Sequence, residues 1–345
     1  VVLTATDGSG NTDNCNATVT VEDNIDPTAV CQNATIQLDG AGNALVVPGD
    51  IDNGSSDNCA IAGMFVNPAA FTCANIGANT VTLTVTDVNG NSSTCTATVT
   101  IEDNVDPNAV CQNITVQLNG SGNASIVAAD VDGGSSDNCA IASLAVDPST
   151  FDCDDIGANT VTLTVTDVNG NVSTCTATVT VEDDIDPTIV CQDITVQLDA
   201  TGNVSIVGAD IDGGTTDNCS QIGIDITLDA SPADFDCNDV GTSSVTLTAT
   251  DAYGNVSTCT ADITVEDDVP PTAVCQDITV QLDATGNVSI VAADVDGGSS
   301  DNCAIDNLSV SQEDFVCAEV GGNTVTLTVT DVNGNVSTCT ATVTV

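Results

Sequence analysis

The sequence predicts an all-β protein built as a tandem array of antiparallel β-sandwiches, with about seven strands each, joined end to end by short acidic linkers. Segments such as TVTLTVTD (80–87) alternate polar and apolar residues, which is typical of half-buried strands. Thr and Val dominate, and no long run of helix formers occurs. Cysteines recur at fixed spacings, which indicates that one structural unit is repeated along the chain.

The composition predicts that this acidic chain folds, and it limits the partners of the chain. The formal net charge is −50 with no Lys, Arg or His, yet 41% of the residues are hydrophobic, unlike a disordered acidic tail. Nothing in the chain can neutralise phosphate, which excludes nucleic acid. Seventeen cysteines predict disulfides and an extracellular or cell-surface location. No apolar run reaches the roughly 20 residues of a membrane span.

The same composition argues against an enzyme. No His, Lys or Arg is present to act as a base, a Schiff-base amine or an oxyanion donor. Two carboxylates could serve a glycosidase, but the chain has no Trp and a single Tyr, Tyr253, to stack on a sugar ring. We therefore expect no catalytic residue and no organic cofactor.

The cysteine spacings define the repeats. The first cysteines of successive repeats lie 80, 80 and 84 residues apart, at Cys31, Cys111, Cys191 and Cys275. Residues 1–21 match 81–101, so we interpret the chain as a slice of a longer array. The predicted domains are the C-terminal hairpin of a truncated repeat (1–24) and four repeats, named repeats 1 to 4 below: 25–104, 105–184, 185–268 and 269–345.

The first half of repeat 1 contains two predicted strands and an acidic loop. ATIQLD (34–39) alternates as a strand, DGAGN (39–43) turns the chain, and ALVVP (44–48) returns. The acidic loop DIDNGSSDNC (50–59) follows. Because the first strand leaves the linker and the second returns to it, this loop is expected at the end of the repeat that carries the linker, called the linker pole below.

The second half of repeat 1 contains five predicted passes and ends in a hairpin. IAGMFV (61–66) runs away from the linker pole, and a turn at 67–68 leads back up through Phe71 to Cys73. ANIGAN (74–79) brings the chain down again. TVTLTVTD, the VNGN turn and STCTATVTIE (93–102) then form a hairpin, since Asn-Gly between alternating runs is the strongest short hairpin signal.

The linker EDNIDPTAVC (22–31) recurs before every complete repeat and points to a divalent cation. Each copy sets carboxylates and amides beside one or two prolines, which stiffen the turn. Adjacent carboxylates repel one another unless a cation lies among them, and this chain has no cationic side chain. A cluster of oxygen ligands on a stiff turn suits calcium.

Three acidic elements are expected to meet at each linker pole, and we call each meeting point a junction. They are the linker, the loop that contains Asp50, Asp52 and Asp57, and the tip of the last hairpin at Asp87. The DGAGN turn is expected to point the other way, toward the next linker. The spacing is not that of an EF-hand, because a 12-residue loop counted from Asp50 ends at Ile61 instead of Glu.

The predicted calcium ligands follow from this convergence. They are Glu22, Asp23, Asn24, Asp26, Asp50, Asp52, Asp57 and Asp87 at the first junction, Glu102, Asp103, Asn104, Asp106, Asp130, Asp132, Asp137 and Asp167 at the second, Glu182, Asp183, Asp184, Asp186, Asp210, Asp212, Asp217 and Asp251 at the third, and Glu266, Asp267, Asp268, Asp294, Asp296, Asp301 and Asp331 at the fourth. Pro270 stands where the other linkers have Asp, so altered or weaker coordination is expected at the fourth junction.

Each acidic element also has a simpler interpretation. The NGN tip is first of all a type I′ turn. The Asp-x-Asp pair followed by glycine is also typical of a solvated turn with Asx hydrogen bonds. The linker is also compatible with an ordinary acidic surface segment. The convergence of all three, in a chain without basic residues, favours calcium.

The repeat resembles the hyalin-repeat (HYR) family, through the late motif TDVNGNSSTCTATVTIED (86–103) and an early cysteine after an acidic, proline-bearing linker. Its first cysteine is followed by Gln, where the family usually has Pro. The DNC…FxC variant is similar to repeats of large secreted proteins of Bacteroidetes-type bacteria. The resemblance implies an immunoglobulin- or fibronectin-like sandwich in an extracellular, often adhesive protein without catalytic activity. The linkers also resemble those of cadherins, whose neighbouring domains share calcium.

The disulfides are expected within each repeat. Cys59 and Cys73 are placed at the same ends of neighbouring passes, and Cys31 and Cys95 both lie near the linker pole. The predicted pairs are Cys31–Cys95, Cys59–Cys73, Cys111–Cys175, Cys139–Cys153, Cys191–Cys259, Cys219–Cys237, Cys275–Cys339 and Cys303–Cys317. A Cys15–Cys31 pair would span about one domain, beyond the roughly 7 Å Cα limit, so Cys15 is expected to lack a partner in this slice.

Two classes of function remain. The first is a structural filament, stalk or adhesin shaft, stapled by disulfides and stiffened by calcium, whose partners are calcium ions and other copies or a continuation of the same chain. The alternative is an adhesion module that recognises a surface protein or glycan through its loops. The loops are nearly identical between repeats, whereas binding modules usually diversify them, so the sequence favours the first class.

Overall fold

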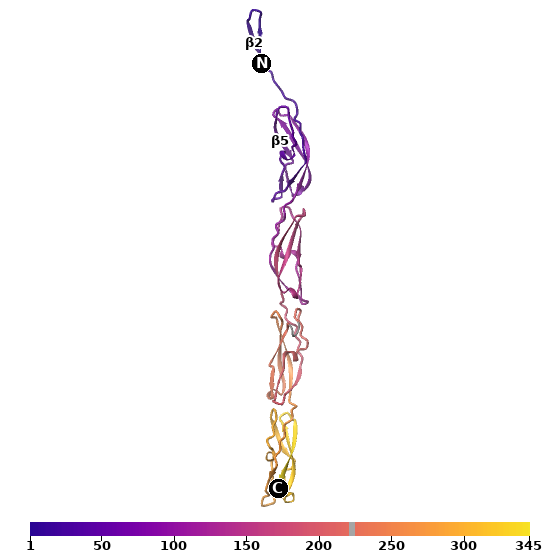
Figure 1. Cartoon of the computed structure of the whole chain (residues 1–345), viewed down its shortest axis with the longest axis vertical. Helices are drawn as coiled ribbons and strands as arrows, with labels where there is room; N and C mark the ends of the chain where they lie inside the picture. Colours follow the sequence, from indigo (N-terminus) through magenta and orange to yellow (C-terminus); the bar gives the residue numbers. More distant parts are fainter. Residues whose placement is uncertain (221–224) are drawn as a thin grey trace. The chain divides into compact units, whose positions relative to one another are not determined.

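The computed structural model describes residues 1–220 and 225–345, so residues 221–224 of the predicted repeat 3 lie outside the described part. The described chain is all-β apart from helices of three or four residues, as the sequence predicts (Figure 1). By internal packing it divides into two units, Val1–Val116 with Ser125–Phe151 and Gly157–Val181, and Gln117–Ala124 with Asp152–Ile156 and Glu182–Val345. Each junction treated below lies within one unit.

Repeat 1 is a sandwich of two sheets. Its strands are β3 (Ala34–Gln37), β4 (Asn43–Leu45), β5 (Ile61–Asn67), β6 (Ala70–Thr72), β7 (Gly77–Asp87) and β8 (Ser92–Glu102). Four of them form a sheet in the order β3-β8-β7-β5, and β4 pairs with β6. The short helices α1 (Pro48–Ile51) and η1 (Cys73–Asn75) follow β4 and β6.

The alternating pattern forms the core of this sandwich. Val81, Leu83 and Val85 of β7 are fully buried, whereas the threonines between them are half-buried. They share one hydrophobic cluster with Phe71 and Ala44 of the smaller sheet. Each fully buried Val or Leu contributes about 1.5–3 kcal/mol, so a small aliphatic core with one Phe holds the two sheets together.

The structure differs from the expected strand arrangement in two details. The first and last strands pair in parallel, with Ala34 opposite Val99 and Gln37 opposite Glu102. Since both strands run from the linker pole to the far pole, neighbouring positions make them parallel. Six strands form, because the end of the predicted ANIGAN pass is the start of β7 and its beginning belongs to η1.

The segment after β5 changes sheets instead of turning back. Ile61 of β5 lies opposite Asp87 at the linker pole, and Asn67 lies opposite Thr82. The chain then crosses at Pro68 into β6, where Thr72 pairs with Asn43 beside the DGAGN turn. The predicted return through Phe71 to the linker pole is therefore wrong, and Cys73 lies at the far pole.

The other repeats contain the same elements in the same order. Repeat 2 has β9 (Ile114–Gln117), β10 (Asn123–Ser125), α2 (Ala128–Val131), β11 (Ile141–Asp147), β12 (Thr150–Asp152), η2 (Cys153–Asp155), β13 (Gly157–Asp167) and β14 (Val172–Glu182). Repeat 3 has β15 (Ile194–Gln197), β16 (Asn203–Ser205), η3 (Gly208–Asp210), β17 (Thr227–Ser231), β18 (Asp234–Asp236), η4 (Cys237–Asp239), β19 (Gly241–Thr250) and β20 (Val256–Glu266). Repeat 4 has β21 (Ile278–Thr279), β22 (Asn287–Ser289), α3 (Ala292–Val295), β23 (Ile305–Val310), β24 (Asp314–Val316), η5 (Cys317–Glu319), β25 (Gly322–Asp331) and β26 (Val336–Thr344).

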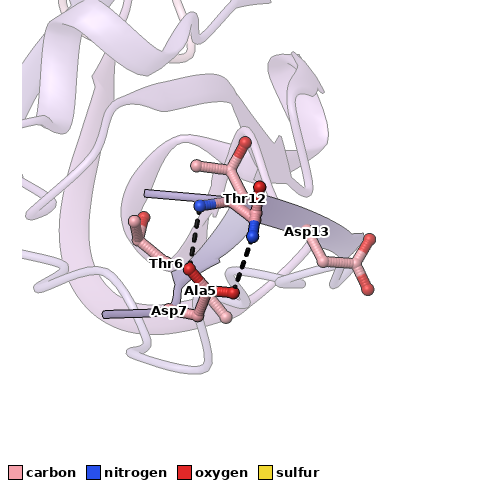
Figure 2. Close-up of a pocket in the computed structure, with 6 residues that line it drawn as sticks. Ala5, Thr6, Asp7, Thr12 and Asp13 are labelled. Carbon is pink, nitrogen blue, oxygen red and sulfur yellow. Dashed lines mark hydrogen bonds between the residues drawn. The ribbon is translucent and has the colours of Figure 1, made fainter. Parts of the chain in front are cut away.

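Residues before the first linker form the predicted hairpin of β1 (Val2–Thr6) and β2 (Thr12–Asn16). Figure 2 shows Ala5, Thr6, Asp7, Thr12 and Asp13, which line a hollow beside the hairpin turn, with hydrogen bonds joining the two strands. Asp7 Oδ1 accepts hydrogen bonds from the Ser9 and Asn11 amides, and these bonds tie the turn together. The hairpin residues are exposed throughout, so the hollow is part of an open surface.

Candidate metal centres at the junctions between repeats

Seven disulfides connect the described chain, and four of them lie within single repeats as the sequence predicts. These pairs are Cys31–Cys95, Cys111–Cys175, Cys191–Cys259 and Cys275–Cys339. In repeat 1 the bond joins the last residue of the linker to the first half of β8, with 5.8 Å between the Cα atoms. The bond therefore ties the start of a repeat to its last strand.

The other three disulfides join neighbouring repeats, so the expectation that all disulfides are internal is wrong. They are Cys73–Cys139, Cys153–Cys219 and Cys237–Cys303. The predicted pairs that do not form are Cys59–Cys73, Cys139–Cys153, Cys219–Cys237 and Cys303–Cys317. Cys15, Cys59 and Cys317 are free and exposed.

The sheet change at Pro68 explains this correction. It carries Cys73 to the far pole, where its Sγ lies 3.8 Å from the carbonyl oxygen of Gly42 in the DGAGN turn. Cys59 stays at the linker pole, two residues before β5 begins opposite the hairpin tip. Two cysteines at opposite poles of one sandwich cannot meet the roughly 7 Å Cα limit of a disulfide. The far pole of one repeat faces the linker pole of the next, so Cys73 meets Cys139.

The three acidic elements meet at each of these junctions through one aspartate each, in a group that we call a triad. The linker supplies Asp103, the acidic loop Asp137 and the hairpin tip Asp167, and one oxygen of each lies within 4.8 Å of the others. The equivalent triads are Asp183, Asp217 and Asp251 at the third junction, and Asp267, Asp301 and Asp331 at the fourth.

Local hydrogen bonds fix each carboxylate of the second triad. Asp137 Oδ2 accepts the backbone amides of Cys139 and Ala140, which folds the loop around the carboxylate. Asp103 Oδ1 accepts the Val105 amide and an Nδ2 hydrogen bond from Asn138. Backbone geometry therefore positions these oxygens before any ligand arrives.

Burial leaves part of each triad without a hydrogen-bond donor. Asp103 is 6% exposed and Asp167 is 2% exposed. Asp103 Oδ2 and Asp137 Oδ1 have no donor among the described residues, and the equivalent atoms of the third and fourth triads have none either. A buried carboxylate oxygen without a partner is costly, because it has lost its water without replacement. The same unpartnered oxygens recur at three junctions, and this arrangement is compatible with a bound cation.

Asp167 remains charged in this setting. Burial raises the pKa of its carboxyl group, but hydrogen bonds from the Asn171 side chain and from the amides of Asn171, Asn169 and Gly170 outweigh burial and hold the pKa below its ordinary value. Ionised carboxylates 4.8 Å apart repel by about 3 kcal/mol per pair at an effective dielectric constant of about 20. A bound cation turns this repulsion into attraction.

Many predicted ligands lie outside the triads. The Asp-x-Asp pairs are engaged in their own loop, where Asp130 Oδ2 accepts the Val127 amide and Asp132 Oδ1 accepts the Ser135 amide. Glu102 Oε2 accepts a hydrogen bond from Gln37 of its own repeat. The predicted carboxylate ligands that the structure does not place in one of the acidic groups are Glu22, Asp26, Asp50, Asp52, Asp87, Glu102, Asp106, Asp130, Asp132, Glu182, Asp184, Asp186, Asp210, Asp212, Glu266, Asp268, Asp294 and Asp296. The predicted amide ligands Asn24 and Asn104 stay predictions.

Pro270 also falls outside the triad of its junction. It occupies the position of Asp106, which is exposed and not a triad member. Asp267, Asp301 and Asp331 are grouped like the other triads. The replacement of Asp by Pro at this position therefore gives no structural reason for weaker coordination at the fourth junction.

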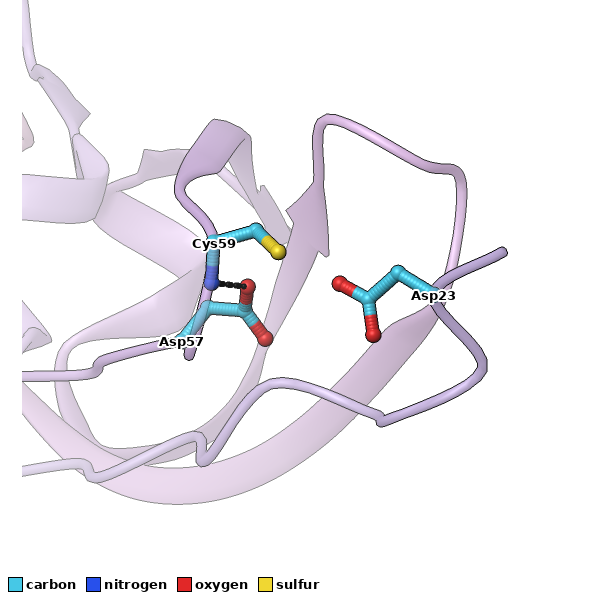
Figure 3. Close-up of side chains that lie close together, drawn as sticks. All are labelled: Asp23, Asp57 and Cys59. Atoms are coloured by element: carbon cyan, nitrogen blue, oxygen red, sulfur yellow. Dashed lines mark hydrogen bonds between the residues drawn. The ribbon is translucent and has the colours of Figure 1, made fainter. Parts of the chain in front are cut away.

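The first junction is more open than the others. Its group consists of Asp23, Asp57 and the free thiol of Cys59, which point toward one another in Figure 3. A hydrogen bond with Asp23, some loss of hydration and the charges of Asp23, Asp57 and Asp87 raise the pKa of the exposed Cys59 thiol. Asp23 is half-buried, whereas its equivalents Asp103, Asp183 and Asp267 are only 5–6% exposed.

A residue that the sequence analysis did not nominate lies at the centre of each junction. Asn138 Nδ2 donates to Asp103 Oδ1 at 3.1 Å and to the carbonyl oxygen of Asp39, in the DGAGN turn of repeat 1, at 3.2 Å. Asn218 and Asn302 make the equivalent pairs of contacts. The signal was present in the sequence, because DNC recurs in all four repeats.

Glycine in the turn DATGN (199–203), which is the equivalent of DGAGN in repeat 3, allows the close approach of the next repeat. Gly202 has a φ of +76°, and a Cβ atom there would lie 2.8 Å from the carbonyl oxygen of Asn302 and 2.7 Å from Cys237 Sγ. A side chain at this position would therefore push the turn away from the next repeat.

Replacing Gly202 with Ala is expected to loosen the fourth junction. Hydrogen exchange measured by mass spectrometry should show at least about tenfold faster opening around Asn302, for a cost of about 1–2 kcal/mol. Gly286→Ala is the matched control, because Gly286 has a similar φ of +81° but only Cys317 Sγ within contact range. Equal effects of the two variants on exchange at Asn302 would contradict this interpretation.

No family model matches the chain. A curated "Uncharacterized 81.3 kDa protein" of Acholeplasma phage L2 is 27% identical over 188 residues, which cover 51% of this chain and 24% of the phage protein. The chain therefore spans about a quarter of the length of this relative.

Similar solved structures are cadherin ectodomains. Protocadherin Gamma B7 extracellular cadherin domains 1–4 are 17% identical, with 79% of this chain and 84% of that chain covered and a TM-score of 0.31. Drosophila N-cadherin EC1–4 is 14% identical, with 94% of each chain covered and a TM-score of 0.28. The described residues contain no helix long and apolar enough to cross a membrane.

Proposed function

We propose that this chain is a segment of an extracellular structural array, a filament, stalk or adhesin shaft, whose repeats are held in register by calcium and disulfides at their junctions. The observation that carries the proposal is the triad of buried Asp103 and Asp167 with half-buried Asp137, in which two oxygens lack donors among the described residues, beside the Cys73–Cys139 bond. The same combination recurs at the next two junctions.

Calcium suits the donor set of the triads. It takes six to eight oxygen ligands in a flexible geometry, whereas magnesium demands a near-ideal octahedron and keeps most of its waters. Three carboxylates, supplemented by carbonyl oxygens and water, match the first preference. The bound ion would supply the positive charge that this chain lacks altogether.

The placement of the ligands gives calcium a mechanical role. Asp103 directly follows β8, the last strand of repeat 1, whereas Asp137 and Asp167 belong to repeat 2. An ion held by all three would fix the end of β8 against the loop and hairpin tip of the next repeat. Without the ion, the three carboxylates repel and the linker is free to move away from the loop.

The disulfides support an extracellular location. Seven bonds join fourteen of the seventeen cysteines, which indicates an oxidising compartment. Small sandwiches of about 80 residues have limited cores, so covalent links and ions would contribute a large share of their stability. The hyalin-repeat resemblance is consistent with this proposal, because its motif spans the β7–β8 hairpin and the linker at Asp103.

Replacing Asp103 with Asn should remove one calcium ion from the chain. Isothermal titration calorimetry of chelator-treated protein should show one site fewer than in the unaltered chain, or that site weakened by at least about tenfold, a loss of about 1.4 kcal/mol. Asp106→Asn is the matched control, because it removes the same charge from an exposed position outside the triad. No heat on adding calcium to the unaltered protein would refute the calcium proposal.

A recognition module remains the second candidate, and one exposed aromatic residue favours it. Phe65 on β5 is 63% exposed beside a hollow lined by Met64, Thr84 and Thr86. Exposed aromatic residues are enriched in binding surfaces. Repeats 2, 3 and 4 have Ala145, Asp229 and Ser309 at the corresponding positions, so the feature belongs to one repeat. Saturable binding of a defined surface protein or glycan, lost in Phe65→Ala, would favour recognition over a purely structural role.

A further inference from the structure

We propose that calcium binding and the disulfide between repeats stabilise each other through the three consecutive residues Asp137, Asn138 and Cys139, with Asn138 as the positioning residue. The same holds for Asp217–Cys219 and Asp301–Cys303. This inference rests on the proposed calcium sites and adds a covalent partner to them. Its consequence is a junction in which the ion protects the disulfide from reduction, and the disulfide raises the affinity for the ion.

The first basis is the connection of the three residues. Asp137 is a triad member, and its Oδ2 accepts the amide of Cys139, the residue bonded to Cys73 of repeat 1. Any movement of Cys139 therefore moves the hydrogen bond that holds Asp137. The ion ligand and the disulfide are two residues apart on one tight loop.

The second basis is the double contact of Asn138. Its side-chain amide group joins Asp103 of the triad to the carbonyl oxygen of Asp39 in repeat 1. Its own carbonyl oxygen lies 3.6 Å from Cys73 Sγ and 2.8 Å from the position of a Cβ on Gly42. Asn138 thus contacts the triad, the turn of the preceding repeat and the disulfide.

The third basis is a comparison within the chain. The first linker follows residues 1–21, which match only 81–101, so the chain contains no turn equivalent to DGAGN and no equivalent of Cys73 before this junction. Cys59 is therefore free there, and Asn58 donates to Asp23. There the linker aspartate is half-buried and Asn58 is exposed. At the three bonded junctions the linker aspartate is 5–6% exposed and the asparagine is half-buried. The linker aspartate is therefore more buried at the junctions where the turn of the preceding repeat packs against the asparagine and a disulfide joins the two repeats.

Thermodynamic linkage makes the effect reciprocal. If docking of the bonded turn raises the affinity for calcium by some factor, calcium shifts the equilibrium between disulfide and dithiol by the same factor. Couplings of this kind usually amount to 5–150-fold. Closing the triad excludes water from the ligands, which is why the docked state is expected to bind the ion more tightly.

The test measures reduction of each disulfide in the full chain, with calcium or with EDTA. Free thiols are first blocked with iodoacetamide, and a phosphine then reduces the protein for a limited time. Each step breaks one S–S bond, and the phosphine takes one oxygen atom from water to become its oxide while the two sulfurs gain the two hydrogens. New thiols are labelled and mapped after digestion at Asp, since the chain has no Lys or Arg for trypsin.

Calcium is expected to slow reduction of Cys73–Cys139, Cys153–Cys219 and Cys237–Cys303 by about tenfold relative to EDTA. The bonds within repeats, such as Cys31–Cys95, serve as internal references and should change by less than about twofold. In Asn138→Ala, the ratio of rates should fall toward one at Cys73–Cys139 and stay unchanged at Cys153–Cys219. A ratio of rates is insensitive to a merely structural loosening that acts equally with and without calcium.

Asn58→Ala is the matched control, because it removes the equivalent side chain at the junction without a bonded turn, and it should change no ratio. Equal protection of all seven disulfides, or full protection in Asn138→Ala, would overturn the coupling. Calorimetry on the same samples separates the two proposals. Calcium that binds without protecting the bonds between repeats refutes the coupling alone, whereas absence of calcium binding refutes the proposed function.

Discussion

Chelation of divalent ions is expected to lower the free energy of unfolding of repeats 2, 3 and 4 by about 2.7 kcal/mol each, where free calcium had stood a hundredfold above the dissociation constant. The physical reason is that the folded triad binds the ion and the unfolded chain does not. Asp103, Asp183 and Asp267 would then be left buried beside other carboxylates without a cation. Hydrogen exchange in each repeat, with calcium and with EDTA, measures the change repeat by repeat.

Two controls separate ligation from screening. Sodium chloride at equal or higher ionic strength weakens repulsion between exposed charges over about 8–10 Å, but it supplies no directional ligand to a buried site. It should therefore restore only a small part of the lost protection. In the triple variant with Asp103, Asp183 and Asp267 replaced by Asn, calcium should no longer matter at these three junctions. Identical exchange in calcium and EDTA in the unaltered chain would contradict the prediction.

The strands with regular alternation could be predicted from the sequence. In β7 and β8 every second residue is apolar, and an Asn-Gly turn joins them, so local signals are sufficient. The path of the chain after Asn67 could not be predicted in this way. A proline after β5 is compatible with a reversal or with a change of sheet, and only the packing of Phe71 in the core of the sandwich decides between them.

The disulfides between repeats depend on that same decision. Regular spacing shows that cysteines are equivalent from one repeat to the next, but it does not distinguish a partner in the same repeat from one in the next. Cys59 and Cys139 occupy the same position in repeats 1 and 2. Because Cys73 lies at the far pole of repeat 1, it bonds to Cys139 of the next repeat and not to Cys59 of its own. The wrong prediction for the turn after β5 therefore led to wrong partners for the cysteines of all three disulfides between repeats.

The location of the acidic sites could be predicted from the sequence, whereas the residues that form them could be predicted only in part. The convergence of linker, loop and hairpin tip follows from strand directions alone, and each element does contribute one aspartate to a triad. The Asp-x-Asp pair looked equally suitable, but the amides of Val127 and Ser135 use its oxygens within the loop. Such competition between a backbone donor and a metal depends on dihedral angles that a sequence pattern does not show.

The second large effect on the free energy of unfolding is expected from removal of disulfides. A bond within a repeat should stabilise one repeat, whereas a bond between repeats should stabilise two. Replacing Cys111 and Cys175 together with Ala removes a bond that closes a loop across 64 residues of repeat 2. Chain entropy assigns about 4 kcal/mol to a loop of this length. Hydrogen exchange should accelerate accordingly in repeat 2, and repeat 4 should keep its protection.

Replacing Cys73 and Cys139 with Ala is expected to weaken two repeats at once. When repeat 2 unfolds beside a folded repeat 1, its chain is anchored at the linker residue Asp103 and at Cys139, 36 residues apart (139 − 103). When repeat 1 unfolds beside a folded repeat 2, Cys73 and Asp103 anchor 30 residues (103 − 73). The disulfide restricts each of these unfolded loops and so raises the free energy of the unfolded state by about 3–4 kcal/mol. The variant loses this stabilisation in both repeats.

The pattern of exchange therefore distinguishes a bond within a sandwich from a bond between sandwiches. A variant without Cys73–Cys139 should exchange faster in both repeat 1 and repeat 2, whereas the Cys31–Cys95 and Cys111–Cys175 bonds still hold each core. Faster exchange in repeat 1 alone would indicate that the bond acts like an internal staple, as the Cys59–Cys73 pairing would have done. Each bond between repeats anchors only the two repeats that it joins. Loss of one bond should therefore speed hydrogen exchange in those two repeats and leave exchange in more distant repeats unchanged.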